Sequence, residues 1–144
     1  MKEPLISERT SRLAKAKGIL IRPEGKWVSL YNRKGLLTFC SKDSPLGVAV
    51  FSNKESRISG AYSLWALQQV LREQYNIHPY VVPYGEMPST GVETWKISNI
   101  RFLHRSTEEN MLMFSAFRNE YKDKKFESFE AATDEALFNC LNFI

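Results

Sequence analysis

The sequence predicts an α+β fold in one domain over residues 1–144, with an antiparallel sheet of two hairpins or a meander and three to four helices packed on it. Three observations support this fold class. Segments with helical spacing of apolar residues begin at Ser and end near Gly or Asn. Runs of aromatic and branched residues are separated by turn residues. A chain of 144 residues with 43% hydrophobic residues can also bury enough surface to fold without disulfides.

The first expected element is a short helix over residues 7–18. Ser7 supplies an N-cap oxygen, and Gly18 can adopt the left-handed conformation that follows a helix. Its apolar residues share one face and its basic residues project from the other, so we expect a small amphipathic helix with a basic back.

A β-hairpin is expected next, with strands at residues 26–31 and 36–40. Both runs are rich in aromatic and branched residues, and the turn between them contains Asn32 and Gly35, where positive φ angles are tolerated. The apolar run over residues 47–51 predicts a third strand, followed by a polar connection. Trp27, at the start of the hairpin, is expected to lie in the core.

The middle of the chain predicts a helix and a second hairpin. Apolar residues at helical spacing cover residues 63–76, with Ser63 as N-cap and Asn76 as C-cap. Strands are expected at residues 80–84 and 93–102, and Pro79 and Pro83 favour an edge position for the first of them.

Two helices are expected in the C-terminal part. Ser106 to Glu109 has the form of a capping box and favours a helix after it, although periodicity does not decide between helix and strand for residues 108–121. The last helix begins near Ser128, where apolar residues form one stripe.

The charge and the termini narrow the class of protein. The formal net charge is +4, and residues 1–60 carry twelve Lys and Arg against five Asp and Glu. The amino terminus lacks the apolar run of a secretory signal, and no stretch approaches the length of a membrane-spanning helix. We therefore expect a cytoplasmic protein without membrane contact, with Cys40 and Cys140 as reduced core thiols.

No pattern for catalysis or for a cofactor emerges. The seven glycines form no phosphate-binding loop, and His78 and His104 lack a second His or Cys at metal-ligand spacing. Cys40 with one of these histidines is the available thiol and base combination, and both residue types have ordinary structural explanations. We expect no cofactor, no metal and no catalytic residue. A small enzyme is therefore the third functional hypothesis, after the two binding hypotheses given below.

Three segments resemble a group of small, functionally uncharacterised proteins encoded by gut-anaerobe genomes, their mobile elements and their tailed phages. The segments are Leu13-Ala14-Lys15-Ala16-Lys17-Gly18, Leu71-Arg72-Glu73-Gln74-Tyr75-Asn76-Ile77-His78, and Phe126-Glu127-Ser128-Phe129-Glu130-Ala131-Ala132 with Ala136-Leu137 and Leu141-Asn142-Phe143-Ile144 after it. The resemblance implies an α+β domain in a phage-related or mobile-element setting. It brings no reaction, cofactor or site residue.

The first functional hypothesis is non-catalytic binding to another protein or to a second copy of this chain. Apolar residues off the buried stripes of two helices would form the interface, unless other elements cover them. The candidate residues are Trp65, Arg72, Phe138 and Leu141.

The alternative hypothesis is nucleic-acid binding by the basic N-terminal half, where cationic and aromatic residues interleave. The candidate contacts are Arg9, Arg12, Lys15, Arg33 and Lys34. A solvated basic surface would explain the same charges.

Overall fold

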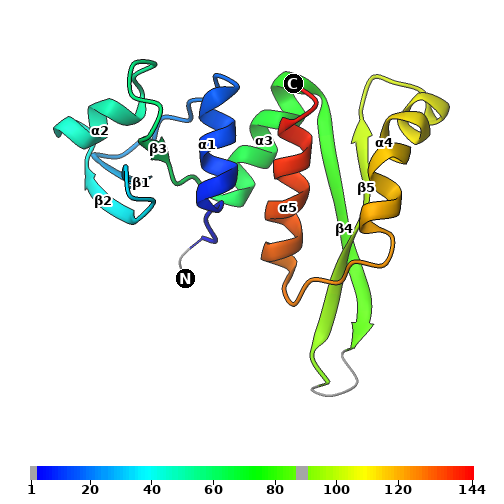
Figure 1. Cartoon of the computed structure of the whole chain (residues 1–144). Helices are drawn as coiled ribbons and strands as arrows, with labels where there is room; N and C mark the ends of the chain where they lie inside the picture. Colours follow the sequence, from blue (N-terminus) through cyan, green and yellow to red (C-terminus); the bar gives the residue numbers. More distant parts are fainter. Residues whose placement is uncertain (1–2, 87–90) are drawn as a thin grey trace. The chain divides into compact units, whose positions relative to one another are not determined.

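The computed structural model describes residues 3–86 and 91–144. Within these ranges, five helices and two antiparallel sheets confirm the predicted α+β class (Figure 1). The chain folds as two compact units, Met1–Leu67 and Gln68–Ile144. The expectation that residues 1–144 form a single domain stays a prediction.

The first unit is built on a three-stranded sheet with strand order β2-β1-β3. Its elements are α1 (Glu8–Ala16), β1 (Trp27–Tyr31), β2 (Leu37–Ser41), α2 (Pro45–Val50), β3 (Ser59–Gly60) and the start of α3 (Leu64–Tyr75). The predicted first helix and first hairpin are thereby confirmed. The Ser7 hydroxyl accepts from the Thr10 amide, and Gly18 has a φ of 79° beyond the helix end.

The strand expected over residues 47–51 is wrong, because this segment forms the short helix α2. Ser44 caps the helix by accepting a hydrogen bond from the Gly47 amide at 3.2 Å, and Pro45 occupies the first turn. A Cβ on Gly47 would lie 2.3 Å from the Ser41 carbonyl oxygen, so glycine lets the helix approach β2 closely. Short apolar runs do not distinguish strand from helix, and the capping residues decide here. The third strand is β3, inside the expected polar connection.

One face of the first sheet carries the core of the first unit. Val28 and Leu30 point from β1 toward Val50 of α2 and Ile58, and all four side chains are at most 4% exposed. Because side chains alternate along a strand, the residues between them point to the opposite face, which this core does not cover.

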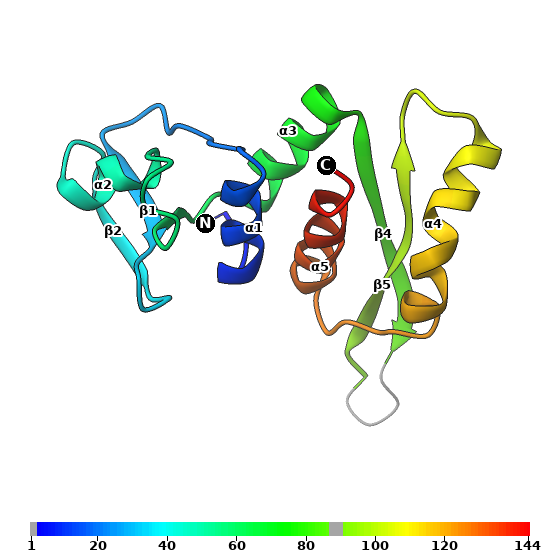
Figure 2. The ribbon, with the colours of Figure 1, turned by 45° about the horizontal axis from the view of Figure 1, so that its top comes forward.

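The second unit is a long β-hairpin with two helices. It contains the rest of α3, β4 (Ile77–Glu86), β5 (Glu93–Phe102), α4 (Thr107–Tyr121) and α5 (Phe129–Leu141). In Figure 1 α5 lies beside β4 and α4 beside β5, and Figure 2 shows the same order after rotation. β4 extends beyond its predicted range at both ends, and β5 matches its predicted range. Residues 108–121 are helical, as the capping box favoured, and Ser128 caps α5.

A β-bulge in β5 explains a break in its hydrophobic pattern. Tyr80 pairs with Asn99 and Val81 with Ile97, so Ser98 is an extra residue without a partner. The bulge shifts the alternation by one residue, and Ile97 and Ile100 therefore both point to the buried face.

Asn110 ties the start of α4 to the end of β5. Its side chain is 4% exposed; it accepts a hydrogen bond from the Phe102 amide and donates to the carbonyls of Phe102, Arg105 and Ser106 at 2.9–3.1 Å. A buried Asn on the inward face of a helix is satisfied here by the turn that precedes the helix.

Candidate functional site

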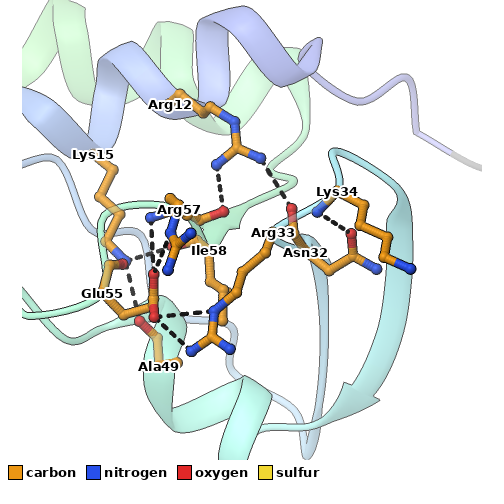
Figure 3. Close-up of polar contacts among 9 residues, drawn as sticks. All are labelled: Arg12, Lys15, Asn32, Arg33, Lys34, Ala49, Glu55, Arg57 and Ile58. Carbon is orange, nitrogen blue, oxygen red and sulfur yellow. Dashed lines mark hydrogen bonds and ion pairs between the residues drawn. The ribbon is translucent and has the colours of Figure 1, made fainter.

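The basic residues expected to contact nucleic acid are mostly bound within the first unit (Figure 3). The Arg12 guanidinium donates to the Asn32 carbonyl at 2.9 Å and to the Arg57 carbonyl, and its Nε lies 2.9 Å from a Glu8 carboxylate oxygen. Arg12 thus connects α1 to the hairpin turn and to the segment before β3. These bonds use the donors that a phosphate would need.

Lys15 has a similar structural role. Its ammonium donates to the carbonyls of Ala49, Glu55 and Ile58, the first at 3.0 Å (Figure 3). Ala49 belongs to the last turn of α2, whose carbonyls have no partner inside the helix. Burial lowers the pKa of Lys15, and nearby Glu55 opposes that shift. Lys15 caps α2 and fastens the following loop to α1.

Arg33 pairs with Glu55 across the same unit. Its Nη2 lies 2.6 Å from a Glu55 carboxylate oxygen, and its Nε lies 3.1 Å from the same oxygen. The hydrogen bond from Arg33, followed by one from the Arg57 amide, lowers the pKa of Glu55. Arg9 and Lys34 are exposed. The predicted nucleic-acid contacts Arg12, Lys15 and Arg33 therefore bind acceptors of this chain.

The residues expected at a protein interface differ in exposure. Trp65, in the first unit, is 42% exposed, and Arg72, in the second unit, is exposed as well. Phe138 is half-buried, whereas Leu141 is fully buried. The prediction that Leu141 is exposed at an interface is wrong, because the buried side of α5 is wider than the apolar stripe predicted from the sequence.

The large apolar side chains that are exposed on the strands of the first sheet are not among those expected at a protein interface. Trp27, Leu37 and Phe39 point to the face of β1 and β2 opposite the core, and they are 54%, 58% and 67% exposed. We call these three side chains the hairpin face. The expectation that Trp27 lies in the core is wrong, because Val28 and Leu30 are the residues of β1 that face α2.

The register of the hairpin holds the three side chains together. Trp27 pairs with Ser41 and Phe39 with Ser29, so the two rings are diagonal neighbours. Their centroids are 5.5 Å apart with 20° between the planes, so each ring covers one face of the other. Leu37, opposite Tyr31, extends the apolar area along β2.

β2 is an edge strand of this sheet, with β1 as its neighbour. It carries no charged residue and no proline, the features that commonly protect an edge from pairing with another chain. The hairpin face and this edge are therefore contiguous surfaces suited to contact with another polypeptide. The alternation of side chains in residues 37–41 could have indicated an apolar face on this strand. The pattern does not show which of the two faces is covered by the core.

The thiols and histidines do not form a recognisable catalytic group. Cys40 is half-buried against the core of the first unit, and Cys140 is buried, which raises the pKa of its thiol. His78 stacks edge-on against Tyr80, with centroids 4.8 Å apart, and its Nδ1 has no hydrogen-bond partner among the described residues. Burial, and then nearby Arg72, lowers the pKa of His78. The ring contact with Tyr80 is the role that the structure shows for His78.

Two pairs of neighbouring carboxylates, Glu108 with Glu109 and Asp134 with Glu135, have local contacts. Glu109 lies near Arg105 at 4.0 Å, and Glu135 accepts from the Tyr121 hydroxyl at 3.0 Å. Across residues 3–86 and 91–144, no three His, Cys, Asp or Glu side chains come together as metal ligands. None of the helices in the described ranges is long and apolar enough to cross a bilayer.

Comparison of the chain with family models, with curated proteins and with solved structures gave no match.

Proposed function

We propose that this protein acts without catalysis, as an accessory protein that binds another protein through the hairpin face. The observation that carries the proposal is the group of three apolar side chains, each more than half exposed, on one face of a sheet whose other face is packed. Leaving such a group in water is unfavourable, at roughly 25 cal/mol per Å² of apolar surface, and a partner that covers it recovers this free energy.

The chemistry of the face favours a protein over nucleic acid. Bases stack on open aromatic faces, and here Trp27 and Phe39 stack on each other, which leaves one face of each ring for a base. Leu37 is aliphatic and offers no stacking surface. Arg12, Lys15 and Arg33 are bound to groups of the chain itself, which occupies donors that phosphates would need.

The biological setting of the protein is also part of the proposal. A phage-related or mobile-element origin, which the resemblance supports, is consistent with an accessory protein. A cytoplasmic location, expected from an amino terminus without the apolar run of a secretory signal, is consistent with it too. The partner is then expected to carry a complementary apolar surface, and a second copy of this chain meets that requirement through its own hairpin face.

The test is affinity purification from the native host, with the double variant Leu37→Thr/Phe39→Thr beside the wild type. Threonine keeps the strand preference while it removes the apolar side chains. Val48→Thr is the matched control, because Val48 is 57% exposed in the same unit but lies in α2. We expect a partner that the wild type and the control retain and the double variant loses.

Sedimentation velocity of the purified chain separates the two kinds of partner. A dimer that the double variant abolishes identifies the partner as a second copy, and a monomer at all concentrations identifies it as a different protein. The proposal fails if the double variant, still folded by circular dichroism, retains every bound protein and the same mass.

A further inference from the structure

A groove lies between β5 and α4 in the second unit. It encloses about 560 Å³, which is within the range of small-ligand sites. Its floor is apolar, with Ile97, Phe114 and the ring of Tyr121, each at most 8% exposed. Its rim is polar, with Tyr84, Lys96, Ser98, Asn99, Lys122 and Asp123.

The rim holds an excess of hydrogen-bond donors. The side chains of Ser98, Asn99 and Lys122 make no hydrogen bond or ion pair with any other residue in the described ranges. Asp123 is the one carboxylate among the lining residues that the structure describes, and it forms no ion pair there. Because the β5 bulge adds Ser98 as an extra residue, Ser98 and its neighbour Asn99 both reach the groove.

The cationic side of the groove is held in place by Tyr84. The ammonium of Lys96 lies 4.8 Å from the centroid of the Tyr84 ring, and that of Lys125 lies 5.1 Å from it. Neither ammonium has a carboxylate within 4 Å among the described residues. Lys96 lines the groove and Lys125 lies beside it at the same ring. The lining lysines Lys96 and Lys122 outnumber the lining carboxylate Asp123, so the groove attracts a ligand that supplies negative charge.

We infer that this groove binds a phosphate-bearing ligand with an aromatic or apolar body. The phosphate accepts hydrogen bonds from Lys96, Lys122 and the Asn99 amide, while the body lies on Ile97 and Phe114. The inference is independent of the hairpin face, which belongs to the other unit. Two sources share this chemistry: a free nucleotide and a single strand of nucleic acid.

The test is a titration of the ¹⁵N-labelled full chain, followed by amide chemical shifts. The probes are adenosine monophosphate, adenosine, inorganic phosphate and a short oligothymidylate. We expect shifts at Ser98, Asn99 and Lys122 with adenosine monophosphate at about 1 mM and little change with adenosine. Saturation by the mononucleotide at a lower concentration indicates a free nucleotide, whereas tighter, salt-sensitive binding of the oligonucleotide indicates a strand.

Substitutions test which groups carry the binding. Lys96→Gln and Lys122→Gln should each weaken binding about tenfold, because each removes a charge-assisted hydrogen bond. Lys54→Gln, an exposed lysine of the first unit, is the control and should change nothing. The inference is overturned if no phosphate probe shifts the groove amides, if adenosine binds as tightly as its monophosphate, or if folded lysine variants bind like the wild type.

Discussion

Replacing Lys15 by Met tests whether this lysine is a structural cap. Its ammonium donates to three backbone carbonyls, those of Ala49, Glu55 and Ile58, which come from α2 and the loop after it. Methionine keeps most of the apolar stem and its packing but supplies no donor, so the carbonyls lose a shared partner. The substitution therefore removes the cap and little else.

The size of the effect follows from these contacts. An acceptor left without its partner costs about 1 to 3 kcal/mol when it is buried. The Ala49 carbonyl keeps a hydrogen bond from the Ser52 amide at 3.1 Å, and water reaches some of these carbonyls because Lys15 is half-buried. The variant also no longer buries an ammonium, whose cost appears as the lowered pKa of Lys15. We expect a net loss of about 2 kcal/mol in the free energy of unfolding.

Urea unfolding at neutral pH, followed by tryptophan fluorescence, measures this loss. Lys34→Met is the matched control, because Lys34 is exposed in the same unit and its side chain has no bond in the described structure; its effect should stay within about 0.5 kcal/mol. Equal stability of the two variants would refute the structural role of Lys15. Lys15 would then again be a candidate surface charge for binding nucleic acid.

Three further predictions concern buried groups. Asn110→Ala should lower the free energy of unfolding by about 2 to 3 kcal/mol, because it leaves the buried amide of Phe102 without its acceptor; Ser115→Ala, on the exposed side of α4, should not. Gly60→Ala should cost about 1 to 3 kcal/mol in the same assay, since a Cβ there would lie 2.2 Å from the Tyr62 ring, and an unchanged midpoint would contradict this packing. Burial raises the pKa of Tyr121 to about 12, so the unfolded state ionises first and stability should fall by about 2 kcal/mol between pH 10 and 12. The Tyr121→Phe variant should not show this part of the loss in the free energy of unfolding. Identical pH profiles of stability for the variant and the wild type would show that the hydroxyl is not buried.

Local patterns predicted most of the secondary structure. Ser7, Ser106 and Ser128 each cap the helix that begins after them, because an N-cap acts on amides two or three residues ahead and needs no distant contact. The two hairpins followed from turn residues between apolar runs for the same reason. The error at residues 47–51 arose where a short apolar run lacked a distinguishing period.

The roles of the cationic side chains could not be predicted from local sequence patterns. Arg12 and Lys15 looked like a basic surface because their acceptors, such as the carbonyls of Arg57 and Ile58, are more than 40 positions away in the chain. Backbone carbonyls have no signature in the sequence, since every residue carries one. Which cations remain available for a ligand is therefore a property of the folded chain.

Local sequence patterns were enough to predict the fold class, the starts of four of the five described helices and the alternation of the strands. Tertiary structure decided which face of the first sheet is covered, because α2 packs on Val28 and Leu30 and leaves Trp27 and Phe39 exposed. An alternating strand offers both faces equally, and only the element that packs against one of them makes the other a surface for a partner.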